Sequence, residues 1–240
     1  MKILITGGSS GLGLAMTKKL AMDDGNFIYF TYNSSIERAN ELMAAHSNTK
    51  AIKCDFTNES ELQNLLNEIE SFDLDVLINN AISSKITMKH FDKMDIDIFK
   101  NSFLHNIIPT IQITQKCVAG FKKKKQGRII TTLTSFLANK PPTGCSEYVA
   151  SKAYLESLSK SWASEYIKYN ISSNCISPSF MLTDFTNDTD ERMIEEQTAQ
   201  HPLKRLLDPA EVADTISYLT TCSLQINGIN LFINAGTNLI

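Results

Sequence analysis

The sequence predicts an α/β fold in a single domain: a doubly wound parallel sheet of about seven strands with helices on both faces. Three observations predict it. Short runs rich in β-branched and aromatic residues alternate with helix-like stretches along the whole chain. Several of these runs, such as residues 76–78, are apolar at consecutive positions, as strands covered on both faces are. The 240 residues suffice for one large domain, and we see no linker or repeat that would divide residues 1–240.

The expected elements follow one another in a regular order. The strands are expected at 3–6, 27–32, 51–54, 75–79, 128–133, 171–176 and 229–233. The helices are expected at 12–22, 36–45, 59–71, 96–121, 148–169 and 209–220. Two helix starts carry a capping residue: Asn58 precedes an acidic first turn, and Asp208 precedes a proline at the first helical position. The polar stretch 182–202 has only a weakly helical middle, so we expect a substrate flap at about 181–202.

The composition excludes several classes of protein. Apolar residues make up 42% of the chain and charged residues 20%, as in a globular protein with a real core. The formal charge of −3 gives no basic footprint for nucleic acid. No apolar stretch approaches the roughly 20 residues that cross a bilayer, and the N-terminus does not resemble a signal peptide. The five cysteines are scattered, which favours buried apolar thiols in a cytoplasmic protein and gives no reason to expect a metal site.

A glycine-rich segment, T-G-G-S-S-G-L-G at residues 6–13, joins the first strand to the first helix. At such a junction, glycines allow a tight turn and the helix N-terminus offers N–H groups to a pyrophosphate. The spacing is G-x-x-x-G-x-G rather than G-x-G-x-x-G, so a merely flexible turn is the alternative. We interpret the segment as a dinucleotide phosphate loop. Its expected cofactor-binding residues are Gly7, Ser9, Ser10, Gly11, Leu12 and Gly13.

The residues after the second strand bear on the choice of cofactor. An acid there would bind the 2′-hydroxyl of NAD, but the first acid is Glu37, and a 2′-phosphate therefore meets no barrier. Asn33, Ser34, Ser35 and Arg38 could donate hydrogen bonds to such a phosphate, although an ordinary polar loop with Arg38 in solvent is the alternative. We expect NADP(H) to be preferred, with NAD(H) as the second possibility.

Tyr148 and Lys152 are four residues apart at the start of a long helical pattern, which places both on one helix face. A phenol ionises near pH 10, and an adjacent ammonium favours the phenolate. Such a pair also occurs by chance as a half-exposed contact, so its neighbours decide the interpretation. Ser135 ends the fifth strand 13 residues before Tyr148, and Asn80 ends the fourth strand at the same sheet edge, where α/β sheets bind ligands.

Together these motifs resemble the short-chain dehydrogenase/reductase family. Near the C-terminus, P-L-K-R-L at 202–206, N-G at 227–228 and A-G at 235–236 resemble signatures of its 3-oxoacyl-[acyl-carrier-protein] reductases. The resemblance implies a Rossmann-like fold in which Tyr148 is the general acid and Lys152 holds the ribose hydroxyls and depresses the pKa of the tyrosine. It implies that Ser135 orients the substrate carbonyl and that Asn106 binds a water in a proton relay. Tyr148 and Lys152 are also cofactor contacts by this resemblance, and the remaining ones that it implies are Asp55, Phe56, Asn80, Ala81, Ile82, Pro178, Met181 and Thr183.

The chain departs from the family pattern at three places. Ile82 and Ser179 each stand where the family usually has glycine, and Ser179 gives up a position free to take a positive φ. The fifth strand is one residue longer than usual, so Thr134 competes with Ser135, and we keep Ser135 for its distance to Tyr148. Pro109 lies just after Asn106 and predicts either a kink that frees carbonyls for water or a simple bend.

These features predict a ketoreductase that reduces a carbonyl to a secondary alcohol, similar to a 3-oxoacyl-[acyl-carrier-protein] reductase. Apolar residues at the flap entrance favour an acyl substrate; they are Phe180, Met181, Leu182 and Phe185. The alternatives are a dehydrogenase of a sugar, polyol or other secondary alcohol, and a non-enzymatic cofactor sensor or scaffold. The lysine run 122–125 is interpreted as a solvated helix end, or else as a docking site for an acidic carrier protein. The resemblance also implies a homo-oligomer, a dimer or tetramer, assembled through residues 96–121 and 148–169.

Overall fold

The computed structural model describes residues 1–83, 86–138, 141–184, 186 and 189–239. Seven parallel strands form one sheet in the order β3-β2-β1-β4-β5-β6-β7. The strands are β1 (Lys2–Ile5), β2 (Phe27–Tyr32), β3 (Thr49–Lys53), β4 (Val76–Asn79), β5 (Gly127–Thr132), β6 (Ile171–Pro178) and β7 (Asn230–Ile233). The predicted fold class is confirmed, and every predicted strand is found to within three residues at each end.

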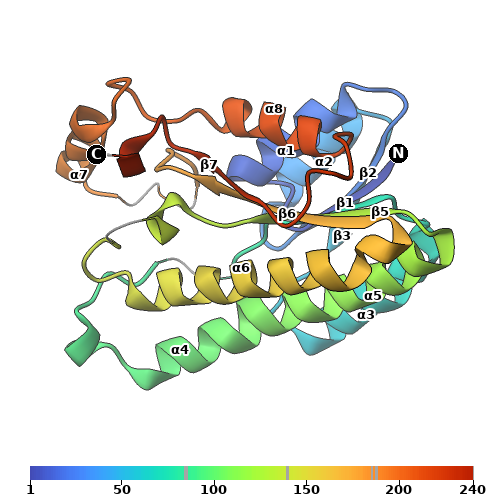
Figure 1. Cartoon of the computed structure of the whole chain (residues 1–240), viewed down its shortest axis with the longest axis horizontal. Helices are drawn as coiled ribbons and strands as arrows, with labels where there is room; N and C mark the ends of the chain where they lie inside the picture. Colours follow the sequence, from blue (N-terminus) through green and yellow to red (C-terminus); the bar gives the residue numbers. More distant parts are fainter. Residues whose placement is uncertain (84–85, 139–140, 185, 187–188, 240) are drawn as a thin grey trace.

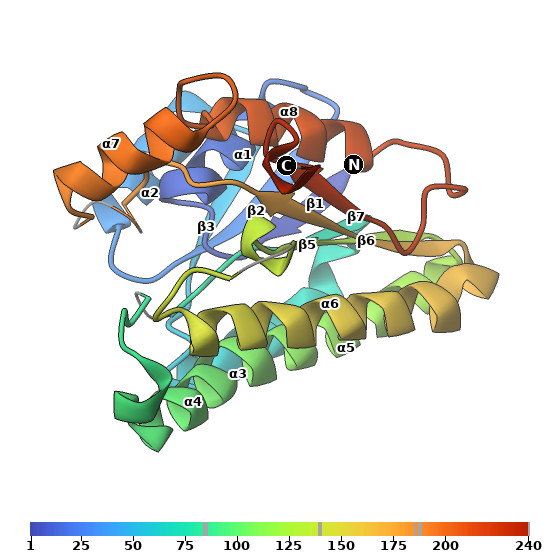
Figure 2. The same ribbon diagram turned by 60° about the vertical axis from the view of Figure 1, so that its left-hand side comes forward.

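Helices cover both faces of this sheet (Figures 1 and 2). One face carries α1 (Gly11–Ala21), α2 (Ile36–Ala45) and α8 (Pro209–Leu219). The other carries α3 (Glu59–Phe72), α4 (Ile96–Ser102), α5 (Ile108–Lys124) and α6 (Ser146–Tyr166). Side chains alternate between the two layers: Ile3 and Ile5 belong to the core under α1 and α8, and Leu4 to the core under α3 and α5. Both faces of the central strand are therefore buried, as its sequence predicts.

Both predicted helix caps are confirmed. The side chain of Asn58 accepts hydrogen bonds from the N–H groups of Ser60 and Glu61. Asp208 forms a complete capping box with Glu211 at the start of α8. These caps satisfy backbone N–H groups that a helix start otherwise leaves without partners, which is why the sequence locates these two boundaries so well.

The predicted helix 96–121 is divided in the structure. A π-helical turn, Phe103–Ile107, separates α4 from α5, and the N–H of Ile108 donates to the carbonyl of Phe103 five residues back. Pro109 causes this arrangement, because it has no N–H for the carbonyl of His105 and its ring crowds that turn. The proline therefore produces a π turn that includes Asn106, where the sequence predicts either a kink or a simple bend.

The stretch from 181 to 202 contains α7 (Glu191–Gln200), which has no buried residue among its ten. Asp190 is the N-cap of this helix, and its side chain accepts from the N–H of Arg192. A weakly helical middle is thus confirmed, and the flap itself stays a prediction. Phe185 lies outside the described residues. In the part of the chain that the structure describes, no helix is both long and apolar enough to cross a membrane.

The topology brings several loops to one edge of the sheet. The strand order reverses between β1 and β4, which is the switch point at which open α/β sheets bind ligands. Ile5 is in register with Ile78, and Thr132 with Ile176, so the residues after β1, β4, β5 and β6 follow at the same carboxyl edge. Every catalytic residue that the sequence predicts, except Asn106, lies after β5, and Asn106 lies in the π turn between α4 and α5.

Candidate active site

The phosphate loop is built around glycines that no other residue could replace without strain. Gly7 and Gly11 have φ values of +68° and +49°, in the left-handed region that favours glycine. Gly13 lies in the first turn of α1, where an added Cβ would be 1.9 Å from the carbonyl oxygen of Gly7. The loop therefore passes directly over the start of α1, and its backbone faces the positive end of the helix dipole.

Threonine side chains that the sequence analysis missed hold this loop in place. The hydroxyl of Thr17 donates to the carbonyls of Gly8 and Gly13, at 2.9 Å each. The hydroxyl of Thr31 accepts from the N–H of Gly7 at 2.8 Å. The spacing of Thr17, four residues after Gly13, is a signal that could have found it, because a helical threonine commonly bonds the carbonyl four residues back. Ser9 is buried, and Ser10 is the N-cap residue of α1.

The end of β4 is clamped to the same loop. The amide of Asn80 donates to the carbonyl oxygens of Thr6 at 3.1 Å and Gly7 at 3.3 Å. The hydroxyl of Thr6 accepts from the N–H groups of Asn80 and Ala81, and a Cβ on Gly7 would lie 3.1 Å from the Cα of Ala81. The triplet at 79–81 thus positions the phosphate loop. Ile82, the next residue, is half-buried.

A polar cluster forms where β2 and β3 end. Asp55 accepts hydrogen bonds from the N–H and hydroxyl of Thr57, which lower the pKa of its carboxyl, and Asn33 contributes a further hydrogen bond. Lys53 lies 3.3 Å from the side-chain oxygen of Asn33. Asn33 and Asp55 therefore lie close together, and their part in binding a cofactor stays a prediction. Phe56, in contrast, is buried in the core, so only its backbone could reach a cofactor. Ser34 is exposed beside Asn33.

Tyr148, Lys152 and Thr134 come together beyond the end of β5. The hydroxyl of Thr134 hydrogen-bonds to Tyr148, and Thr134 is 6% exposed. The Nζ of Lys152 donates to the carbonyl of Thr132 at 2.9 Å and lies 5.9 Å from the centre of the Tyr148 ring. Ser135 begins the 3₁₀ turn Ser135–Leu137 and is half-buried. The structure therefore pairs Tyr148 with the competitor, Thr134, although Ser135 has the expected spacing.

Burial sets the protonation of the two helix residues. It raises the pKa of Tyr148 to about 12, against the hydrogen bond from Thr134, which lowers it. Burial also lowers the pKa of Lys152 to about 8. Lys152, whose Nζ is directed at the carbonyl of Thr132, is not among the causes of this shift, so the expectation that it depresses the pKa of the tyrosine stays a prediction. Tyr148 is a neutral phenol at pH 7 and can give a proton.

Asn106 is held from several sides. Its Oδ1 accepts from the N–H and hydroxyl of Ser83 at 2.7 and 2.8 Å, and its Nδ2 donates to the hydroxyl of Ser102. Its carbonyl accepts from the hydroxyl of Thr110 at 2.7 Å. The π turn packs against α6, which carries Tyr148 and Lys152. Asn106 thus ties the segment after β4 to the catalytic helix, and its part in a water relay stays a prediction.

The segment after β6 lies against the phosphate loop. Pro178 ends β6, and the N–H of Ser179 donates to the carbonyl of Ile233, so the chain continues there without a positive φ. Met181 packs against the core under α1. A Cβ on Gly11 would lie 3.1 Å from the Cβ of Thr183. The serine that replaces the usual glycine is therefore tolerated by the backbone.

The residues present fit a nicotinamide dinucleotide. The N–H of Gly11 donates to the carboxylate of Asp184 at 3.2 Å, and this carboxylate also pairs with Arg38. An anion of the chain itself thus occupies the N-terminus of α1, where a phosphate is expected. The surrounding pocket has a volume of about 540 Å³, within the range of small-molecule sites. The hydroxyl of Ser179 is buried without a partner among the described residues, so a ligand group could satisfy it.

Substitution of the two competing hydroxyls separates them. We expect Thr134→Ala to lower kcat/KM about 10- to 100-fold, because one hydrogen bond to the reacting groups is lost. We expect Ser135→Ala to change it less than about threefold, since Ser135 lies one residue further along, in the 3₁₀ turn. Thr134→Ser keeps the hydroxyl and serves as the rescuing control. Steady-state kinetics with a ketone substrate measures all three variants, and a larger loss in Ser135→Ala than in Thr134→Ala would restore the original assignment.

Two features outside the site also have plain explanations. Lys124 pairs with Asp73 and Asp75, and Lys122 lies over the ring of Tyr169. The lysine run precedes the start of β5, at the sheet edge opposite to Tyr148, which favours the interpretation as a helix end.

The five cysteines are all buried, in agreement with the prediction of apolar thiols. Among the residues that the structure describes, no group of three His, Cys, Asp or Glu could hold a metal ion.

Comparison with known proteins agrees with this geometry. The family model of short chain dehydrogenases matches residues 1–194. Carbonyl reductase family member 4 of Xenopus laevis is 32% identical over 238 residues, which cover 98% of this chain and 97% of that protein. The 3-oxoacyl-[acyl-carrier-protein] reductase FabG of Staphylococcus epidermidis is 27% identical, with 97% of each chain covered. A candidate NAD(P)-dependent gluconate 5-dehydrogenase from Beutenbergia cavernae, solved with NADP, superposes with a TM-score of 0.90 at 21% identity, covering 100% of this chain and 97% of that one.

The fold and the site define a nicotinamide-dependent oxidoreductase with a Rossmann fold. The chain belongs to the short-chain dehydrogenase family. It therefore acts on a CH–OH or C=O group with NAD(P) as cofactor. This activity distinguishes it from the non-enzymatic sensor or scaffold that the sequence leaves open.

Proposed function

We propose that this chain is an NADP(H)-dependent ketoreductase that reduces a carbonyl group to a secondary alcohol, with Tyr148, Lys152 and Thr134 as its catalytic residues. The observation that carries the proposal is the meeting of these three side chains at the carboxyl edge of β5, beside the phosphate loop after β1. Asn33 and Ser34 after the end of β2, with Arg38 in the first turn of α2 and no acid between β2 and α2, support NADP(H) as the preferred cofactor.

Each residue has a distinct part in the reaction. A dinucleotide held by the phosphate loop and Lys152 would supply the hydride that reduces the carbonyl carbon. Tyr148 gives its phenolic proton to the carbonyl oxygen, and a pKa of about 12 keeps that proton in place at neutral pH. When the carbonyl binds, the single proton of the Thr134 hydroxyl turns from the Tyr148 oxygen to the carbonyl oxygen and fixes the carbonyl, with Ser135 as the alternative donor. Lys152, whose pKa is about 8, is mainly an ammonium at pH 7 and holds the ribose hydroxyls.

An acyl substrate has the better support among the alternatives. Leu182 is 50% exposed at the start of the flap and Phe180, two residues before it, is half-buried, which supports an apolar entrance; Met181 packs against the core under α1 instead. The likeness to a 3-oxoacyl-[acyl-carrier-protein] reductase extends along almost the whole chain. A sugar or polyol dehydrogenase is the second candidate, favoured by the structural likeness to the gluconate 5-dehydrogenase. Cytoplasmic location and delivery of the substrate by a carrier protein stay part of the proposal.

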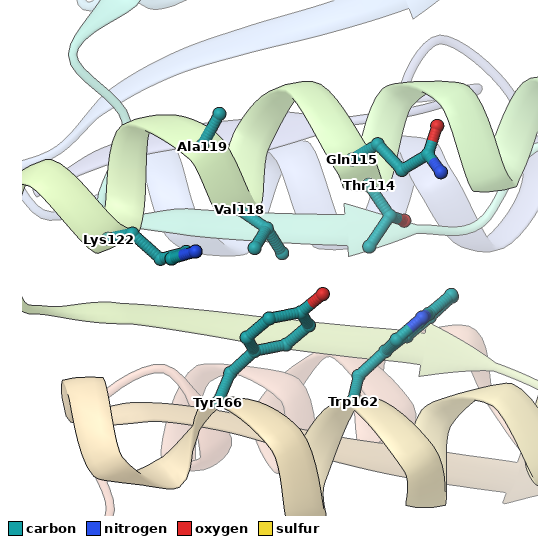
Figure 3. Close-up of a pocket in the computed structure, with 7 residues that line it drawn as sticks. All are labelled: Thr114, Gln115, Val118, Ala119, Lys122, Trp162 and Tyr166. Carbon is teal, nitrogen blue, oxygen red and sulfur yellow. The ribbon is translucent and has the colours of Figure 1, made fainter.

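Assembly as a homo-oligomer through α5 and α6 is also part of the proposal. A groove of about 230 Å³ lies between these two long helices, with Trp162 and Tyr166 of α6 facing Val118 and Lys122 of α5 (Figure 3). Trp162 and Tyr166 are only half-buried, although they are large and aromatic. Aromatic side chains that a single chain leaves partly exposed are typical of surfaces that a second copy covers.

A substrate comparison tests the proposed reaction. We expect oxidation of NADPH with an acetoacetyl thioester as substrate to have a kcat/KM at least about tenfold above that for oxidation of gluconate or a polyol with NADP⁺. The physical reason is the apolar entrance, which binds an alkyl chain and gives polyhydroxylated substrates few partners. Absorbance at 340 nm measures both directions in the same assay. A preference for gluconate would favour the second candidate. If no substrate were turned over with NADP(H) or with NAD(H), the proposal as a whole would be contradicted.

A further inference from the structure

The ion pair between Asp184 and Arg38 joins two segments that are far apart in the sequence. Asp184 follows β6, and Arg38 lies in the first turn of α2. Both side chains are between 40% and 50% exposed, so the pair lies at the surface of the pocket that the phosphate loop lines. The same carboxylate accepts from the N–H of Gly11 at the start of α1. The Asp184 carboxylate therefore occupies both the N–H of Gly11 and the guanidinium of Arg38, two groups that would otherwise be available to bind a phosphate.

This arrangement is a contact between an internal anion and an anion-binding site. The N-terminus of α1 and the guanidinium of Arg38 are each typical phosphate ligands. Both groups lower the pKa of the Asp184 carboxyl below its usual range, so the carboxylate stays charged at neutral pH. The hydroxyl of Thr186 accepts from the N–H of Thr183 at 2.9 Å and donates to the carbonyl of Met181 at 2.7 Å. This turn holds the residues before Asp184 against the loop.

We propose that Asp184 competes with the phosphate groups of the cofactor, and that by holding Arg38 it lowers the affinity for NADP(H) relative to NAD(H). The inference rests on the proposed function, because it requires a dinucleotide at the phosphate loop. A 2′-phosphate that approaches Arg38 meets the negative charge of Asp184 and must displace it. NAD(H) has no 2′-phosphate and needs Arg38 less, so it loses less affinity through this competition.

The proposal predicts a shift in cofactor selectivity when the charge is removed. In Asp184→Asn, we expect the Kd of NADPH to fall about fivefold and that of NADH to change less than twofold. Exposed ion pairs are weak, so the effect should be modest, and it should shrink as salt is added. Isothermal titration calorimetry with the full chain gives both constants without any turnover. Glu37→Gln is the matched control, because it removes the same charge from an exposed position beside Arg38 and should leave both constants unchanged.

A double-mutant cycle shows whether Asp184 acts through Arg38. We expect Arg38→Met to weaken NADPH binding about tenfold and NADH binding less than twofold. In the Arg38→Met background, the further change Asp184→Asn should no longer alter the ratio of the two constants. Unchanged or weaker NADPH binding in Asp184→Asn, with normal binding by the unaltered protein, would overturn this inference alone. Failure of the unaltered protein to bind either dinucleotide would overturn both this inference and the proposed function.

Discussion

Replacement of Tyr148 by phenylalanine is expected to lower kcat by about 10²- to 10⁴-fold, the usual contribution of a positioned general acid. The phenylalanine keeps the ring beside Lys152 but has no proton to give to the carbonyl oxygen. Because the Tyr148 hydroxyl acts on the substrate, we expect the Kd of NADPH to change less than about threefold. Stopped-flow or steady-state absorbance at 340 nm gives the rate, and quenching of protein fluorescence gives the Kd.

Tyr154→Phe is the control for this experiment. Tyr154 lies on the same helix, is 43% exposed, and packs its ring edge against Phe103. The substitution removes a hydroxyl of the same kind and keeps that ring contact, so activity should stay within about twofold of the unaltered protein. If Tyr148→Phe retained near-normal turnover, another group would have to supply the proton and the assignment of Tyr148 would be wrong.

Replacement of Gly13 by alanine is expected to cost both stability and cofactor affinity. The added Cβ would lie 1.9 Å from the carbonyl oxygen of Gly7 and 2.9 Å from the amide nitrogen of Asn80. Two backbone segments must then move apart, and overpacking of this kind costs about 1–3 kcal/mol. In a protein of this size, each kcal/mol lowers Tm by about 2–4 °C. The same movement pulls the loop away from the phosphates, so the Kd of NADPH should rise about 100-fold.

Gly120→Ala is the matched substitution. Gly120 lies within α5, and an added Cβ there meets nothing within 4 Å. Since alanine is the better helix former by about 1 kcal/mol, this variant should have an equal or higher Tm and an unchanged Kd. Thermal melts followed by circular dichroism, with binding measured at 20 °C, cover both variants. A Gly13→Ala variant with the Tm and Kd of the unaltered protein would show that the loop tolerates a side chain.

The sequence predicts most of the fold because the fold depends on local patterns. Apolar runs locate the strands, and capping residues such as Asn58 and Asp208 locate helix starts, since each satisfies N–H groups within three residues of itself. The glycines of the phosphate loop are equally readable, because a positive φ or a close backbone approach admits little else. The π turn at Phe103–Ile107 was only partly predictable. Pro109 shows that a hydrogen bond is missing, but not how the helix rearranges around the gap.

The parts of the site that the sequence does not predict depend on contacts between distant residues. Spacing alone favours Ser135 over Thr134, but the chain at Thr134 is extended and turns only afterwards, so Thr134 meets Tyr148. The direction of the Tyr148 pKa shift depends on burial, which a helix-face argument does not contain. The contact of Asp184 with Arg38 joins residues 146 positions apart. Only the assembled sheet edge brings such residues together.

The burial of all five cysteines has a consequence for how the protein meets oxidants and alkylating reagents. Burial raises the pKa of Cys54 to about 12 and that of Cys175 to about 11, and it raises the pKa of Cys117 and Cys145 as well. The thiolate is the reactive form of cysteine, and at these raised pKa values almost none of these four thiols is ionised at neutral pH. Because all five thiols are buried, electrophiles reach the sulfur atoms only when the core opens. The rate of thiol labelling therefore reports the rate at which the core opens, and this measurement does not depend on catalytic activity.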